Sequence, residues 1–255
     1  SQNTLNLAIK AFKNLNLSQE KKNKINTIIF VTETPIYSFP GNGFLFASEL
    51  NFKNNLSIFD LNSGCTGFVD ALNLAKNFDG ITLIICSETY TKYLKKFNRA
   101  TSTLFADAAT AFFYDKKFKV IKYNSFFKKN SYQDLCATNK SNLFMNGSSV
   151  FNFVTSDVIP GLKKFLKKVK SNKIKKLYIH QASQLVIDTF KEKFSHYKFE
   201  IPTNIKSYGN TNASTIPLLL LEDLKKQNLK KGDYIILCGF GVGLSYSIAL
   251  VKINE

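Results

Sequence analysis

The sequence predicts an α/β fold with mainly parallel strands, and three observations support this prediction. Short β-branched runs alternate with amphipathic stretches along the 255 residues, which is the pattern of strands linked by crossover helices. At 44% hydrophobic and 21% charged residues, the chain has enough apolar side chains to bury a core. No stretch rich in Pro, Gly or Ser divides the chain, so we expect one compact unit.

The first half of the chain is expected to hold two helices and four strands. Apolar residues at helical spacing predict the helices, and β-branched apolar runs predict the strands. In chain order they are a helix over Thr4–Leu15, strands over Thr27–Thr32 and Leu56–Leu61, a helix from Gly64 to Lys76, a strand over Ile81–Ser87, and a bend and strand over Leu104–Tyr114.

The second half repeats this order. Its expected elements are a strand over Ile174–His180, a helix over Ser183–Phe194, an irregular strand approach over Ile201–Tyr208, a helix from Asn210 to Leu224, and strands over Asp233–Cys238 and Leu244–Ile253. The spacing from Ile28 to Cys65 is similar to that from Leu177 to Asn210, which indicates a duplication. Two such halves would place their helix N-termini at a shared centre.

The chain is strongly basic, with 35 Lys and Arg against 18 Asp and Glu and a net charge of +17. Arg99 is the only arginine, whereas dedicated nucleic-acid readers favour arginine, so we do not expect nucleic acid as a partner. The densest basic run follows an apolar helical stripe and comprises Lys163, Lys164, Lys167, Lys168, Lys170, Lys173, Lys175 and Lys176. Either a solvated helix face or a docking patch for an acidic partner explains this run.

The four cysteines are too few and too dispersed for a disulfide scaffold, and they form no metal-type cluster. They favour a reducing compartment, and no secretory signal opens the sequence. The region Tyr234–Ile253 is apolar, but its three glycines make a strand, turn and strand the better interpretation. We therefore expect a cytoplasmic protein without a metal site or a membrane partner.

Cys65 is the candidate nucleophile. It lies in the small-residue turn Asn62–Phe68, between a predicted strand and the first turn of a helix. The partial positive charge of a helix N-terminus favours the thiolate, so we expect a lowered thiol pKa. Cys86 and Cys238 lie in apolar strands and Cys136 in a polar stretch. Cys65 alone has the setting of a nucleophile, although a structural small residue is the alternative.

Three further stretches carry weaker signals, each with a structural alternative. His180 ends a predicted strand, where α/β folds place ligand-facing side chains, although a lone histidine there is often structural. Asn210 fits a helix N-cap. The glycines of Gly239–Gly243 suit a tight hairpin and also leave backbone N–H groups accessible. No helix with G-x-G-x-x-G spacing follows them, so they are not a dinucleotide fingerprint.

Taken together and in this order, the motifs strongly resemble those of the β-ketoacyl-acyl-carrier-protein synthase III family of the thiolase-like superfamily. They are G-C-T-G-F, S-E-T-Y, F-A-D-A-A-T-A, H-Q-A-S, Y-G-N-T-N-A-S and G-F-G-V-G-L-S. The resemblance, which extends from Thr4 to Val251, implies a thiolase-like duplicated fold of five layers, α/β/α/β/α, without the family's opening strand. It also implies a homodimer. Residues 1–115 would form the N-terminal half with the nucleophile, incomplete at its start, and residues 116–255 the C-terminal half with the histidine and asparagine.

The resemblance also implies roles for individual residues. Cys65, His180 and Asn210 correspond to a catalytic triad, and the backbone N–H groups of Cys65 and Val242 to an oxyanion hole. Implied substrate-binding positions are Phe39, which would reach across the dimer, and Arg99, Phe105, Met145, Gly147, Gly241 and Gly243. For Phe39 and Phe105, ordinary core packing is the alternative. The implied substrates are coenzyme A or acyl-carrier-protein thioesters, with no cofactor.

The chain departs from the family pattern at several positions. Gly64 and Thr66 replace the small pair of the A-C-[AS]-G-F motif, and Ala106 and Ala108 replace the glycines of F-G-D-G-A-x-A. Leu185 stands where H-Q-A-N-x-R has an arginine near the pantetheine entrance, whereas Arg99 matches a second family arginine. Coenzyme A recognition is therefore less secure than the triad, and a carrier-protein thioester is an alternative acyl donor.

Three functions compete at this point. The first is acyl transfer to Cys65 followed by decarboxylative Claisen condensation with a malonyl-type thioester, in which His180 and Asn210 stabilise an enolate oxygen. The second is an acyltransferase that moves the cysteine-bound acyl group to an alcohol or amine. The third is a non-catalytic basic module that docks carrier proteins. The presence of both His180 and Asn210 favours the first.

Overall fold

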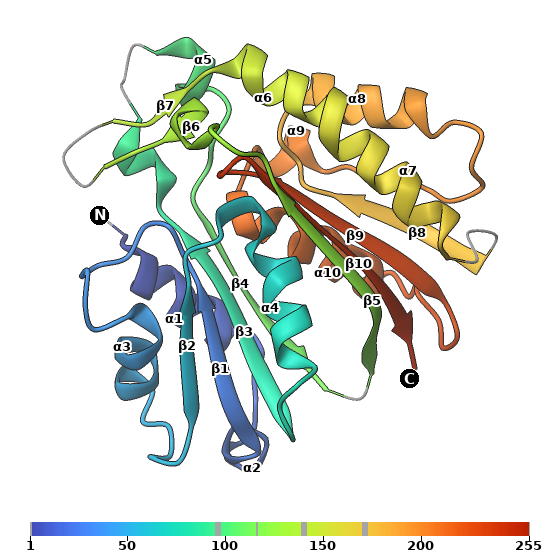
Figure 1. The fold of residues 1–255 in the computed structure, drawn as a ribbon. Helices are drawn as coiled ribbons and strands as arrows, with labels where there is room; N and C mark the ends of the chain where they lie inside the picture. Colours follow the sequence, from blue (N-terminus) through green and yellow to red (C-terminus); the bar gives the residue numbers. More distant parts are fainter. Residues whose placement is uncertain (1, 95–97, 116, 139–141, 170–172, 255) are drawn as a thin grey trace.

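Two four-stranded sheets face each other across a pair of helices in the computed structural model of the chain (Figure 1). The structure describes residues 2–94, 98–115, 117–138, 142–169 and 173–254. The first sheet has the order β2-β1-β3-β4, and its strands are β1 (Ile25–Val31), β2 (Ser57–Leu61), β3 (Ile81–Glu88) and β4 (Ala108–Tyr114). The first three strands are parallel, and β4 pairs antiparallel with β3.

The second sheet has the order β5-β10-β9-β8. Its strands are β5 (Phe118–Phe127), β8 (Ile174–Ile179), β9 (Tyr234–Gly241) and β10 (Ser245–Ile253). Only β8 and β9 are parallel, because β9 and β10 form a hairpin and β5 joins β10 antiparallel. The expectation of mainly parallel strands is therefore wrong for this sheet. The sequence analysis missed β5, whose lysines and asparagine interrupt its apolar pattern.

Helices complete five layers (Figure 1). The central layer holds α4 (Gly67–Ala75) and α10 (Thr215–Lys225), and α1 (Thr4–Lys13) and α3 (Asn42–Glu49) cover the outer face of the first sheet. The outer face of the second sheet carries α6 (Gly147–Phe153), α7 (Ile159–Lys167) and α8 (Gln184–Lys193), with a π-helical turn over Val154–Val158 joining α6 to α7. Short elements are α2 (Gln19–Asn23), α5 (Arg99–Ser102), α9 (Ile205–Tyr208), β6 (Leu135–Cys136) and β7 (Phe144–Met145).

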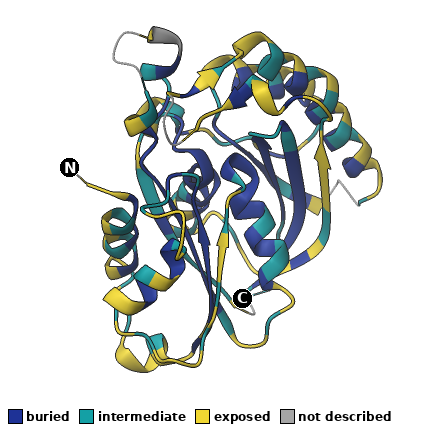
Figure 2. Ribbon diagram, turned by 60° about the vertical axis from the view of Figure 1, so that its left-hand side comes forward, coloured by how far each residue is buried: buried dark blue, intermediate teal, exposed yellow. Residues whose placement is uncertain are grey.

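The core follows the layers. One apolar cluster lies between the sheets around α4 and α10, a second beneath α6, α7 and α8, and a third beneath α1 and α3. Figure 2 shows the buried residues gathered in the strands and the central layer, whereas the outer helices present exposed faces. The proposed boundary at 115/116 falls between β4 and β5, so each half contributes one sheet.

Two local predictions differ from the structure. The segment Ile201–Tyr208 does not lead into a strand. A single β-bridge between Lys176 and Glu200 precedes it, and the segment ends in the short helix α9. Asn210 does not begin a helix either, because a 3₁₀ turn over Asn212–Ser214 separates it from α10. Asn212 has a φ of +54° in that turn, a left-handed conformation that asparagine tolerates well.

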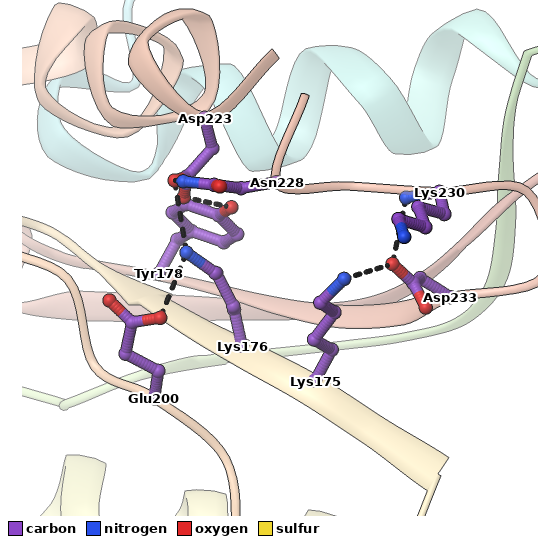
Figure 3. Close-up of polar contacts among 8 residues, drawn as sticks. All are labelled: Lys175, Lys176, Tyr178, Glu200, Asp223, Asn228, Lys230 and Asp233. Atoms are coloured by element: carbon purple, nitrogen blue, oxygen red, sulfur yellow. Dashed lines mark hydrogen bonds and ion pairs between the residues drawn. The ribbon is translucent and has the colours of Figure 1, made fainter. Parts of the chain in front are cut away.

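A buried charge cluster joins β8 to α10 (Figure 3). The Lys176 ammonium pairs with Asp223 and Glu200 at 2.9 Å each, and the Tyr178 hydroxyl donates to Asp223 at 2.6 Å. Burial lowers the pKa of Lys176, but its bonds to Glu200 and Asp223 outweigh burial and raise it. Burial raises the pKa of Asp223, but its donors, Asn228 among them, lower it overall. Both groups are therefore charged and mutually compensated.

Nothing helical in the described ranges has both the length and the apolarity needed to span a bilayer.

Candidate active site

Cys65 lies where β2 runs into the central helix α4. A 3₁₀ turn over Gly64–Thr66 connects them, and Gly64 has a φ of +48°. The side chain is 5% exposed, and its sulfur donates to Asn212 Oδ1 at 2.9 Å. A Cβ on Gly241 would lie 2.6 Å from the Cys65 sulfur. Only glycine therefore lets the end of β9 approach the thiol this closely.

His180 follows the end of β8 and is buried. Its backbone N–H donates to the Cys238 carbonyl at 2.9 Å, and its ring meets the Phe240 ring edge to face at 5.5 Å. Burial lowers the pKa of His180 to about 3, even though a bond to the Asn212 carbonyl raises it. The imidazole is therefore neutral near neutral pH.

Thr215 controls which imidazole nitrogen carries the proton. Its hydroxyl lies 2.8 Å from His180 Nδ1 and also donates to the Asn212 carbonyl at 3.0 Å. A hydroxyl has one proton. When that proton points to the carbonyl, Nδ1 must be the donor and Nε2 is free to accept; when it points to the ring, Nε2 carries the hydrogen. Each orientation of the Thr215 hydroxyl therefore matches one tautomer of His180, and passing from one tautomer to the other also requires transfer of the ring proton.

Asn210 is fixed by contacts on three sides. Its Nδ2 donates to the Ala182 carbonyl at 3.3 Å, its Oδ1 accepts the Asn212 N–H at 3.0 Å, and its backbone forms a bridge with Phe105. One of its two Nδ2 hydrogens has no protein acceptor among these contacts. That hydrogen is available to a bound molecule.

The three side chains line one cavity of about 160 Å³. Its wall is mostly apolar and comes from the segment after β3, the β6–β7 hairpin, α6, the start of α8 and the end of β9. The lining residues that the argument uses are Cys65, Phe105, Met145, Gly147, His180, Leu185, Asn210, Gly241 and Val242. An apolar cavity with a few convergent polar groups is the usual form of a small-molecule site.

The expectation of a lowered thiol pKa at Cys65 is wrong. Burial raises the pKa, and the Glu33 carboxylate raises it further; the backbone N–H groups of Val242 and Cys65 lower it too little to compensate. A helix N-terminus typically contributes about 0.3–1 kcal/mol, which is small against the loss of thiolate solvation. The cysteine of this structure is therefore a neutral thiol. The N–H groups of Val242 and Cys65 face the sulfur.

The sequence analysis missed two residues that approach the thiol. Asn212 accepts the thiol hydrogen, and its Nδ2 donates to Glu33 Oε2 at 3.0 Å. Glu33 follows β1, and Glu88 ends the neighbouring strand β3. The sequence does carry a signal for these two glutamates, because Glu33 lies just after a strongly apolar strand and Glu88 ends another. The carboxyl ends of parallel strands meet at one edge of a sheet.

The other implied substrate positions divide into two groups. Phe105, Met145, Gly147 and Gly241 line the cavity. Phe39 is 85% exposed and outside it, so core packing within this chain does not explain Phe39. Gly243 lies in a separate hollow behind the turn. Arg99 begins α5, but its side chain lies outside the described residues, as does Lys170.

Within the described ranges, no group of three His, Cys, Asp or Glu side chains is arranged to hold a metal ion. All four cysteines are unpaired, with Cys136 exposed and the others buried. The candidate chemistry of this cavity is therefore that of a thiol, an imidazole and an amide.

Two family models match the chain. The model described as 3-oxoacyl-[acyl-carrier-protein (ACP)] synthase III matches residues 59–126, and the model of its C terminal matches residues 166–253. A β-ketoacyl-[acyl-carrier-protein] synthase III from Clostridium perfringens is 32% identical over 99% of this chain and 85% of its own length. Another from Aquifex aeolicus is 29% identical over 96% of this chain and 81% of its own.

Solved structures agree in fold. A 3-oxoacyl-[acyl-carrier-protein] synthase III from Aquifex aeolicus has a TM-score of 0.86 and 28% identity, covering 98% of this chain and 83% of that chain. One from Thermus thermophilus has a TM-score of 0.89 and 24% identity, covering 100% and 85%.

The duplicated sheets and the central helices define a thiolase-like fold, and the relatives above make the chain an acyltransferase of the condensing type. Within that class, the matches above show that the chain belongs to the 3-oxoacyl-[acyl-carrier-protein] synthase III family.

Proposed function

We propose that this chain transfers an acyl group from a thioester to Cys65 and condenses it with a malonyl-type thioester, releasing carbon dioxide. The observation that carries the proposal is the convergence of Cys65, His180 and Asn210, from three different elements, on one cavity. The oxyanion hole is proposed at the N–H groups of Cys65 and Val242. No cofactor enters this scheme.

In the first step His180 acts as a base. With the Thr215 proton on the Asn212 carbonyl, Nε2 accepts the Cys65 thiol proton as the sulfur attacks the thioester carbonyl. The carbon–sulfur bond of the donor breaks, and the departing thiolate takes the proton from Nε2. His180 returns to its neutral state, which its low pKa favours.

In the second step His180 and Asn210 act as hydrogen-bond donors. After the free donor thiol has left, exchange with solvent moves the ring proton from Nδ1 to Nε2, and the Thr215 proton turns to Nδ1. Nε2–H and the free Asn210 Nδ2–H then bind the carbonyl oxygen of the malonyl thioester, which becomes an enolate as carbon dioxide leaves. The enolate carbon attacks the acyl carbonyl, and the two backbone N–H groups bind the resulting oxyanion. One such donor typically contributes about 3–4 kcal/mol. Collapse breaks the bond to sulfur and releases the 3-oxoacyl product, and the Cys65 thiolate takes a proton from solvent to become the thiol again.

The cavity limits the acyl group. An engineered cavity of about 150 Å³ holds one benzene molecule, and this cavity is about 160 Å³. We therefore propose acyl groups of about six carbons or fewer. At the rim, Leu185 is exposed and apolar. Since this position has no positive charge for a nucleotide phosphate, an acyl carrier protein is the proposed donor ahead of coenzyme A.

A homodimer is the proposed assembly, in the cytoplasm. β2 is an edge strand of the first sheet, and apolar side chains around it are exposed: Tyr37, Phe39, Phe44 and Phe59. An edge strand with exposed aromatic neighbours is a surface suited to pairing. Sedimentation should give the mass of two chains, and Phe59→Lys should shift it toward one; a monomeric parent protein would contradict this assembly.

The mass of the intact protein and of its peptides, after incubation with a panel of acyl thioesters, tests the first step. A single acyl adduct should appear on Cys65 and be absent from Cys65→Ser. Exposed Cys136 serves as the internal control for non-enzymatic acylation. An adduct that resists the malonyl thioester but moves to an alcohol or amine would favour the non-condensing acyltransferase instead. No adduct on Cys65, with carrier-protein binding unchanged in Cys65→Ser, would favour a docking module.

A further inference from the structure

A carboxylate close to the nucleophile, that of Glu33, is not among the residues that line the substrate cavity. Glu33 Oε2 accepts a hydrogen bond from Asn212 Nδ2 at 3.0 Å and another from the Tyr90 hydroxyl. Asn212 in turn accepts the Cys65 thiol hydrogen at 2.9 Å. The chain Cys65–Asn212–Glu33 is therefore continuous, and the proposed condensation uses neither the side chain of Asn212 nor Glu33.

The Glu33 carboxylate occupies the space that a side chain at Gly64 would need. A Cβ on Gly64 would lie 2.5 Å from the Glu33 carboxylate, and the φ of Gly64 is +48°. The residue that precedes the nucleophile therefore leaves free the space that the carboxylate occupies. Because the family motif has alanine where this chain has Gly64, glycine and glutamate form a matched pair here.

The amide of Asn212 has one favourable orientation. A carboxylate accepts hydrogen bonds and does not donate them, so Glu33 requires the NH₂ group of Asn212 on its side. The amide oxygen must then face the sulfur, where it accepts S–H and has no hydrogen to offer a thiolate. This contact stabilises the thiol over the thiolate.

The titratable groups around the sulfur come from four segments. They are Glu33 after β1, Glu88 at the end of β3, Tyr90 beyond it, and His180 after β8. Burial and the charge of Glu33 raise the pKa of Glu88 well above its usual range, so Glu88 holds its proton. Burial also raises the pKa of Glu33, but two donors on one oxygen oppose this, so Glu33 ionises first.

We propose that Glu33 is a positioning residue that acts through Asn212 to hold Cys65 as a neutral thiol, with its hydrogen turned away from His180, until an acyl donor is bound. The resting nucleophile is thereby protected from other electrophiles. This inference deepens the proposed function, and iodoacetamide tests it without any acyl substrate, so its failure and the failure of the condensation are distinguishable.

The test is the pH dependence of Cys65 alkylation by iodoacetamide, followed by peptide mass. Glu33→Gln keeps an oxygen for both Tyr90 and Asn212 and removes only the charge. We expect its alkylation profile to move to lower pH, with a rate near neutral pH at least about tenfold higher than in the parent protein. Glu88→Gln is the matched control: Glu88 is a second carboxyl group near the sulfur and is already neutral, so its profile should stay within about twofold.

Asn212→Gly is the second variant, because glycine accepts the positive φ of this position. It removes the acceptor of the thiol hydrogen, so the profile should again move to lower pH. In Glu33→Gln/Asn212→Gly the two shifts should not add, since one acts through the other. Unchanged profiles in both single variants would overturn the proposal. Fully additive shifts, or equal shifts for Glu33→Gln and Glu88→Gln, would also contradict it.

Discussion

Two buried charge clusters in this molecule have opposite characters. At the edge of the second sheet, Lys176 lies between Asp223 and Glu200, so positive and negative charges meet (Figure 3). Beside the nucleophile, Glu33 and Glu88 are both carboxylates, and in the described part of the chain neither forms an ion pair with a lysine or arginine. The charges of the first cluster compensate each other, whereas those of the two glutamates do not.

The difference separates a structural role from a functional one. Compensated buried charges keep their ordinary ionisation and connect elements, as Lys176 and Asp223 connect β8 to α10. Uncompensated ones have perturbed pKa values, and such groups concentrate at functional sites. The glutamates are next to Cys65, whereas Glu200 and Asp223, the partners of Lys176, line a separate hollow. Substitutions in the two clusters should therefore affect different properties.

The largest effect on stability is expected from Asp223→Ala. This substitution removes the buried partner of Lys176 and the acceptor of Tyr178, so the buried ammonium keeps only the exposed Glu200. The free energy of unfolding in urea should fall by about 3–5 kcal/mol, with little change in activity per folded molecule. Glu192→Gln breaks an exposed pair and is the control, with about 0–1 kcal/mol expected. Equal losses in both variants would contradict the structural role.

The largest effect on activity is expected from Gly241→Ala. The new Cβ would lie 2.6 Å from the Cys65 sulfur, where the backbone φ of +156° also disfavours other residues. The sulfur must move relative to the N–H of Val242, so kcat/KM should fall at least about 100-fold. Gly232→Ala is the control, because Gly232 also has a positive φ, meets no atom within 4 Å and does not line the cavity. Parent-like kinetics in Gly241→Ala would show that this approach is dispensable.

A smaller effect on stability is expected from Glu88→Gln, and its sign is opposite to that of Asp223→Ala. Because the folded-state pKa is raised, the unfolded chain releases this proton at lower pH than the folded protein, so wild-type stability falls as pH rises above about 4.5. The glutamine variant avoids that loss. It should be more stable than the parent at pH 8, by on the order of 1 kcal/mol, and equal to it near pH 4. A destabilised variant at pH 8 would mean that the carboxylate is compensated after all.

The smallest expected effect is on the stability at acid pH that the pair of Lys176 and Asp223 contributes. The pKa of Asp223 is lowered in the folded state, so its contribution is present above about pH 3.8 and is lost as pH falls below that value. The stability difference between the parent and Asp223→Asn should therefore shrink below pH 4. A difference that persists at pH 2 would contradict the charge pairing in Figure 3.

Much of this site could be predicted from the sequence, because its parts lie where strands end. Cys65, His180 and Asn210 each follow a predicted strand or turn, and parallel strands bring such ends together. The five-layer arrangement also followed from the repeated strand–helix pattern. By contrast, β5 escaped notice, since it alternates lysine with apolar residues at an edge of its sheet.

The ionisation of the nucleophile could not be predicted in this way. The local pattern around Cys65 indicates a helix N-terminus, which favours a thiolate. Burial and the charge of Glu33 instead raise the pKa of the thiol. Both depend on contacts between segments that are distant in the sequence. The role of Asn212 could not be predicted either. No sequence pattern around Asn212 indicates that its left-handed backbone turns the side-chain amide toward the sulfur.

The central claim is that one cysteine carries the acyl group through to a new carbon–carbon bond. Enzyme first acylated at Cys65 and freed of excess donor should be mixed with a malonyl thioester for a single turnover. We expect carbon dioxide and 3-oxoacyl thioester in equal amounts, matching the loss of the Cys65 adduct. An adduct that persists while carbon dioxide is released, or one that is hydrolysed without a 3-oxoacyl product, would contradict the account.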